Sequence, residues 1–107
     1  MLQLENRHWT IIQSILSKYP YKFYAYGSRV KGNARRLSDL DLCYFENIPD
    51  SVVFQIKDEF TESNLPFLVE LVAWKNMRPI FQQAIQSDLT LICPYPAKTI
   101  SLQPTKK

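Results

Sequence analysis

One segment of this chain combines a glycine turn, basic side chains and two carboxylates. It covers residues 26–42 and contains both glycines of the chain, Gly27 and Gly32. Glycine lets the backbone approach a ligand closely or adopt a positive φ, so a chain this poor in glycine is expected to need both of them in that turn. A basic turn followed by two carboxylates predicts a phosphate-binding element beside a metal-binding element.

The two carboxylates, Asp39 and Asp41, are separated by one residue. On a strand, side chains with this spacing project from the same face, with their Cα atoms about 6.5 Å apart. Like charges at such a distance raise the pKa of one group unless a cation compensates. Oxygen donors with no His or Cys nearby favour Mg²⁺ or Mn²⁺ over zinc. The pair therefore predicts a site for a divalent cation.

A third carboxylate, Glu70, is the single charged residue in the apolar run Phe67–Trp74. The length and composition of this run predict a central strand. Burying an unpaired glutamate there would be costly, so Glu70 is expected to have a function. If its strand lies beside the predicted strand Leu40–Phe45, three carboxylates meet beside a phosphate-binding turn. Two-metal nucleotidyl transfer requires such a group.

Helices and strands are expected to alternate around this segment. The hydrophobic spacing and the turn residues predict helices at about 3–18, 28–36, 49–62 and 77–86, and strands at about 21–26, 40–45, 67–74 and 89–93. Asn76 is expected to cap the last helix, and the inward-facing residues of that helix are expected to be Met77, Ile80, Phe81, Ala84 and Ile85. The order predicts an α/β (α+β) fold, with a mixed sheet of three to four strands flanked by helices.

Length and composition predict one domain, residues 1–93, followed by a frayed tail, residues 94–107. The formal net charge is +3, and the basic cluster is too small for a general nucleic-acid surface. Cys43 and Cys93 lack metal-ligand spacing and are expected to be buried, reduced thiols. No apolar run approaches the roughly 18 residues of a membrane span. We expect a soluble, cytoplasmic protein.

The compound motif resembles that of the minimal nucleotidyltransferases in the DNA polymerase β-like superfamily. Their pattern is Gly-Ser, then Asp-x-Asp after a short interval, then a third carboxylate on a later strand. The corresponding residues here are Gly27-Ser28, Asp39-Leu40-Asp41 and Glu70. The resemblance extends to about residue 93 and implies the palm fold of that superfamily.

The resemblance also implies roles for these residues. Gly27 and Ser28 would contact the β,γ-phosphates of ATP, and the carboxylates would bind two Mg²⁺ ions. The implied nucleotide-binding residues are Gly27, Ser28, Arg29 and Ser38, and the implied catalytic metal ligands are Asp39, Asp41 and Glu70. Family members commonly carry Asp at the third position, so the longer Glu70 keeps the charge but changes the reach.

Small proteins of this kind are typically encoded beside an all-helical HEPN protein. The resemblance implies an antitoxin that transfers AMP from ATP to a tyrosine of that toxin. A chain of about 100 residues suffices for the catalytic palm and leaves little to bind an acceptor, which favours a separate partner. Two alternatives stay open: an antitoxin that neutralises its partner by complex formation alone, and nucleotidyl transfer to a small molecule or an RNA end.

Each site residue also has an ordinary structural explanation. The glycines could only form a turn, and the spacing is not that of a P-loop because Asn33-Ala34 stands where Lys-Ser or Lys-Thr is required. Asp39 and Asp41 could form surface ion pairs, and Glu70 could pair with a structural arginine. His8 lies on the apolar stripe of the first helix and is expected to pack rather than to react.

Overall fold

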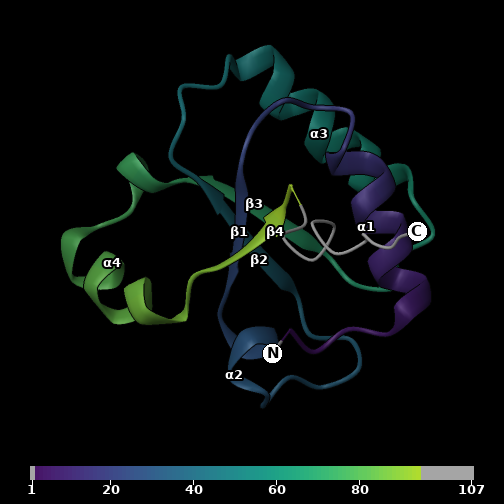
Figure 1. The fold of residues 1–107 in the computed structure, drawn as a ribbon, viewed down its shortest axis with the longest axis horizontal. Helices are drawn as coiled ribbons and strands as arrows, with labels where there is room; N and C mark the ends of the chain where they lie inside the picture. The colour runs from purple at the N-terminus through teal and green to yellow at the C-terminus, as the bar shows by residue number, and fades with distance from the viewer. Residues whose placement is uncertain (1, 95–107) are drawn as a thin grey trace, which may run out of the picture.

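A four-stranded mixed sheet lies between helices in the computed structural model, which describes residues 2–94 (Figure 1). The elements are, in chain order, α1 (Asn6–Leu16), β1 (Phe23–Tyr26), α2 (Ser28–Lys31), β2 (Leu40–Tyr44), α3 (Asp50–Glu62), β3 (Val69–Ala73), η1 (Trp74–Asn76), α4 (Pro79–Ile85), η2 (Gln86–Asp88) and β4 (Thr90–Cys93). The predicted α/β architecture and the predicted order of elements are confirmed. The predicted tail, residues 94–107, lies outside the described residues from residue 95 onward.

The strands follow the order β3-β2-β1-β4. β2 runs parallel to β3, and β1 is antiparallel to both β2 and β4. The prediction that residues 67–74 form a central strand is therefore wrong, because β3 lies at an edge. Its apolar composition reflects two covered faces: Leu71 and Ala73 join one hydrophobic cluster, and Val72 packs against the other.

The larger hydrophobic cluster lies between the sheet and the helices α1 and α3. Ile12 and Leu16 of α1 and Ile56 of α3 are fully buried there with Leu40 and Leu42 of β2. Figure 1 shows the two helices side by side over this face of the sheet. The residues of α1 recur at helical spacing, which explains why the sequence located this helix, although it is shorter at both ends than predicted.

The smaller cluster covers the opposite face of the sheet. Met77 and Ile85 pack there against Tyr26 and Cys43. The rest of the predicted inward face of α4 is not buried: Ile80 is 76% exposed, Phe81 is 43% exposed and Ala84 is exposed. A helix of about two turns presents few side chains to one sheet, so most of its surface remains in solvent. The prediction that Asn76 caps this helix is wrong, because Arg78 is the N-cap and Pro79 occupies the first turn.

Helix α2 is much shorter than the predicted 28–36. Gly32 ends it with a left-handed φ of 84°, and residues 33–39 continue as a loop to β2. A glycine at this position is the usual helix terminator. Cys43 and Cys93 are buried, as predicted. Within residues 2–94, no helix is both long and apolar enough to cross a membrane.

Candidate active site

The glycine turn and the second aspartate are in contact. Gly27 joins β1 to α2 with φ 85° and ψ −157°, a conformation that residues with a side chain rarely adopt. A Cβ atom added to Gly27 would lie 2.5 Å from Oδ2 of Asp41. Glycine is therefore required at this position for two reasons: its backbone conformation and the space that it leaves for the carboxylate.

The three predicted carboxylates lie at one end of the same sheet face. Asp41 and Glu70 are register partners on the parallel strands β2 and β3, and Asp39 precedes β2 by one residue. Because side chains alternate along a strand, all three project away from α1 and α3. Asp41 is partly buried, whereas Asp39 and Glu70 are exposed. The predicted neighbourhood of the two strands is confirmed, and the exposure of Glu70 avoids the cost of burying its charge.

Asp41 is the electrostatic centre of this group. Burial raises its pKa, and the negative charges of Asp39 and Glu70 raise it further. No set of three or more His, Cys, Asp or Glu side chains in residues 2–94 is arranged closely enough to hold a metal ion. The carboxylates are thus close enough to repel one another, but their side chains are not arranged in the geometry of a three-ligand metal site.

Tyr26 borders the carboxylates, and the motif did not identify it as part of the site. It is the antiparallel register partner of Asp41, it is 6% exposed, and its ring packs edge-to-face against Phe81 with the centroids 6.0 Å apart. Burial, followed by the charge of Asp41, raises the pKa of its phenol to about 12. Its position immediately before Gly27 is a sequence signal that could have identified it.

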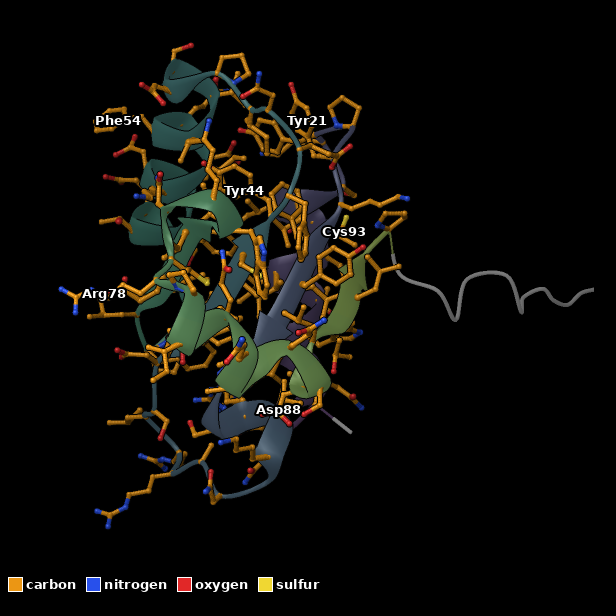
Figure 2. All side chains as sticks on the ribbon, turned by 90° about the vertical axis from the view of Figure 1, so that its left-hand side faces the viewer. Tyr21, Tyr44, Phe54, Arg78, Asp88 and Cys93 are labelled. Atoms are coloured by element: carbon orange, nitrogen blue, oxygen red, sulfur yellow. The ribbon has the colours of Figure 1, made fainter. Side chains whose placement is uncertain are left out.

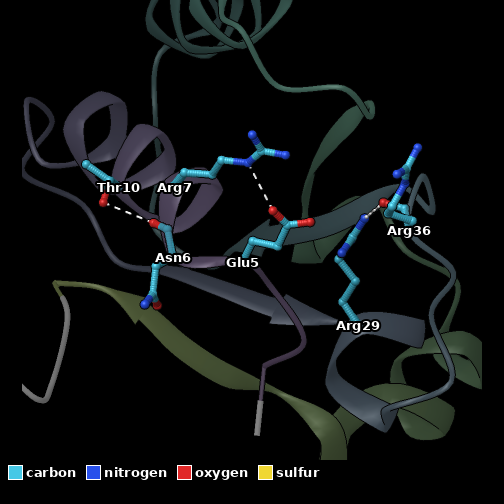
Figure 3. Close-up of polar contacts among 6 residues, drawn as sticks. All are labelled: Glu5, Asn6, Arg7, Thr10, Arg29 and Arg36. Carbon is cyan, nitrogen blue, oxygen red and sulfur yellow. Dashed lines mark hydrogen bonds and ion pairs between the residues drawn. The ribbon is translucent and has the colours of Figure 1, made fainter.

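Arg29 has a different position from the one its motif suggests. Its side chain is 4% exposed and donates hydrogen bonds to the carbonyl oxygens of Gln3, Arg36 and Ser38 at 2.7–3.0 Å. Figure 3 shows the bond to Arg36. The guanidinium also lies 4.1 Å from the ring centroid of Phe67. These contacts lie on the side of α1, so the geometry does not support a contact between Arg29 and a nucleotide phosphate held at the Gly27–Ser28 turn.

Ser38 links this arginine to the carboxylates. Its carbonyl oxygen accepts two hydrogen bonds from Arg29, and its hydroxyl accepts one from the backbone N–H of Arg35 at 2.8 Å. The residue after Ser38 is Asp39, and Leu40 then joins the sheet through a backbone hydrogen bond to Leu68. Arg29 and Ser38 thus fix the loop that delivers the first aspartate to the sheet.

His8 is a packing residue, as predicted. It is 6% exposed, and its ring meets that of Phe67 edge-to-face at 5.4 Å. Phe67 therefore contacts both the histidine and the Arg29 guanidinium. These contacts connect the start of α1 to the loop before β3.

Residues 10–95 match the family model described as polymerase beta, nucleotidyltransferase. The turn, the paired strands and the carboxylates described above all lie within that stretch. The chain belongs to this nucleotidyltransferase family, and it is an enzyme of that class.

The chain is also similar to an individual curated protein. The chain is 33% identical over 95 residues to a probable protein adenylyltransferase, MntA, of Haemophilus influenzae (strain ATCC 51907 / DSM 11121 / KW20 / Rd). The match covers 85% of this chain and 83% of the relative. The similarity therefore extends over nearly the whole of both proteins and is not limited to the motif.

Proposed function

We propose that this protein is a Mg²⁺-dependent protein adenylyltransferase that transfers AMP from ATP to a tyrosine of a helical, HEPN-type toxin and thereby acts as its antitoxin. The observation that carries the proposal is the contact between Gly27 and Asp41, because it joins the predicted phosphate-binding turn to the predicted metal ligands. The relative named as a probable protein adenylyltransferase supports a protein as the acceptor.

In this proposal, Gly27 and Ser28 bind the β,γ-phosphates of ATP. The first N–H groups of a helix have no acceptor within the helix, and Ser28 opens α2. The carbonyl of Gly27 accepts from Val30 and Lys31, so the turn holds its own shape without a ligand. A glycine without a Cβ lets the phosphates approach the carboxylates closely.

The donor set fits Mg²⁺. Asp39, Asp41 and Glu70 offer oxygen atoms alone, and burial, followed by the charges of Asp39 and Glu70, raises the pKa of Asp41, which a bound cation would offset. Bound divalent ions supply charge stabilisation to the attacking and leaving oxygens of an in-line displacement. The aspartates would hold these ions, and Glu70 would complete their coordination or receive the proton of the acceptor hydroxyl.

The transfer itself needs positioning and charge more than covalent chemistry by the protein. The acceptor tyrosine oxygen forms a bond to the α-phosphorus, the bond from that phosphorus to the β-bridging oxygen breaks, and pyrophosphate leaves. The phenolic proton passes to a carboxylate or to solvent. Arg29 acts as a positioning residue in this scheme, because it holds the loop that carries Asp39.

The test is labelling of the partner. The product of the neighbouring gene is incubated with this protein, ATP labelled at the α-phosphorus and Mg²⁺. We expect label on a tyrosine of the partner, and none with Asp39→Ala or Asp41→Ala. The matched control is Asp58→Ala, an exposed aspartate of α3, which should label normally. Undiminished labelling by the Asp39→Ala/Asp41→Ala double variant would refute the catalytic assignment.

A second function is favoured by one observation, the absence of a closed three-ligand group among residues 2–94. In that case the protein neutralises its partner by binding alone. Neutralisation in cells by the Asp39→Ala/Asp41→Ala variant separates the two possibilities, because an enzyme without its metal ligands cannot neutralise by transfer. Labelling of RNA or a small molecule when no protein partner is present would instead indicate a different acceptor.

A further inference from the structure

A polar pocket lies on the α1 side of the molecule and contains none of the three carboxylates. It has a volume of about 400 Å³ and opens between the chain leading into α1 and the loop after α2. Its lining residues are Gln3, Leu4, Glu5, His8, Arg29, Arg35 and Arg36. Three of the seven are arginines and one is acidic, and the volume is in the range of small-molecule sites.

Arg29 forms the buried floor of this pocket. No carboxylate forms an ion pair with it in the part of the chain that the structure describes, where the ion pairs are Arg7 with Glu5, Lys18 with Glu59 and Lys31 with Asp88. Four hydrogen bonds to carbonyl oxygens hold the guanidinium in place but bring no opposite charge. The negative charge of Asp39 acts on the guanidinium without forming an ion pair, so the positive charge is only partly compensated. An anion at this position would reduce the remaining cost of burying that charge.

The two other arginines stand at the rim. Arg35 and Arg36 belong to the loop after α2, and both are exposed. Glu5, on the opposite wall, is engaged by Arg7, whose Nε lies 2.9 Å from its Oε1 (Figure 3). The one acid of the lining is thus already paired with a cation, so the pocket as a whole is positive.

We propose that this pocket binds the phosphate group of a small molecule, at a site separate from the one that holds the substrate nucleotide. Arginine suits this ligand because its planar fork donates two parallel hydrogen bonds to phosphate oxygens. Arg29 supplies a fixed charge with one N–H left to donate, since four of its five N–H groups bind carbonyl oxygens. The exposed Arg35 and Arg36 supply the further donors at the rim. The proposed ligand is not the substrate nucleotide, although Arg29 also holds the loop that carries Asp39.

The experiment is a titration with inorganic phosphate, followed by two-dimensional ¹⁵N NMR of the full chain in EDTA at low ionic strength. We expect saturable shifts of the backbone amides of Gln3, Glu5 and Arg36 and of the Nε–H of Arg29. We also expect the apparent Kd to rise about tenfold in Arg36→Ala, which corresponds to the loss of one charged hydrogen bond. Repeating the titration with pyrophosphate and AMP distinguishes a free phosphate from one carried by a nucleotide.

The matched control is Arg78→Ala, which removes an arginine that points away from the body of the molecule (Figure 2). Its Kd should equal that of the wild type. Equal weakening by Arg36→Ala and Arg78→Ala would mean that phosphate only follows the net charge, and the proposal would fail. It would also fail if the shifts were confined to Gly27 and Ser28, because the phosphate would then occupy the catalytic turn. Arg35→Ala, also at an exposed position, provides a second variant should Arg36→Ala fold poorly.

Discussion

The contact between Gly27 and Asp41 predicts a specific pattern of destabilisation. In Gly27→Ala, the new Cβ would lie 2.5 Å from Oδ2 of Asp41, and the backbone would keep a φ of 85° in a region that glycine alone readily occupies. The backbone strain is about 1–3 kcal/mol. Moving the carboxylate out of its staggered position adds about 0.5–1.5 kcal/mol. We therefore expect the free energy of unfolding to fall by about 2–4 kcal/mol.

Gly32→Ala is the matched control. Gly32 has nearly the same φ, 84°, but an added Cβ would meet no atom within 4 Å. Only the left-handed backbone is penalised there, by about 1–2 kcal/mol. Urea unfolding at equilibrium measures both variants. In thermal melts, a domain of this size loses roughly 4–8 °C of Tm per kcal/mol, so Gly27→Ala should melt at least 8 °C below the wild type.

A double-mutant cycle isolates the contact itself. In Asp41→Ala, the clashing oxygen is gone, so adding Gly27→Ala should cost about 0.5–1.5 kcal/mol less than it does in the wild type. Gly32→Ala should cost the same in both backgrounds. If Gly27→Ala were no more harmful than Gly32→Ala, or if its cost were unchanged by Asp41→Ala, the close approach would be refuted.

Three further outcomes are expected. Burial and then the charges of Asp39 and Glu70 raise the folded-state pKa of Asp41, so the contribution of this carboxyl to stability is lost as the pH rises from its ordinary pKa through the raised value. Above that window, Asp41→Asn should unfold at higher urea than the wild type in EDTA and should lose transferase activity in a separate assay with Mg²⁺, whereas Asp58→Asn should do neither. Burial, followed by the charge of Asp41, raises the pKa of Tyr26 to about 12, so the contribution of this phenol to the free energy of unfolding should be lost between about pH 10 and 12. An absorbance titration of Tyr26→Phe should lack one late-ionising phenol, which Tyr21→Phe should retain. Leu42→Ala, at a fully buried position, should cost about 2–5 kcal/mol in urea unfolding, whereas Leu68→Ala, at a position 68% exposed, should stay within about 0.5 kcal/mol of the wild type.

Local sequence determined the elements of this fold and the chemistry of its motif. Hydrophobic spacing located α1 and α3, because a helix that packs on a sheet must carry an apolar stripe at helical period. Gly27 and Gly32 marked the turn, because few other residues accept their backbone conformations. The spacing of Asp39 and Asp41 placed both on one face of a strand, since side chains alternate along it. These are properties of neighbours in the chain.

Tertiary structure decided what depends on contacts between distant segments. Edge and central strands can carry the same apolar residues, so only the sheet order shows that β3 lies at an edge and leaves Glu70 exposed. The apolar pattern of α4 does not reveal that most of its surface faces solvent. The motif could not disclose that Arg29 turns toward the carbonyls of Gln3 and Ser38, because those partners come from separate segments. Local sequence determines the backbone conformation and the types of side chain present, whereas the burial and the contact partners of each side chain depend on where the fold brings distant residues together.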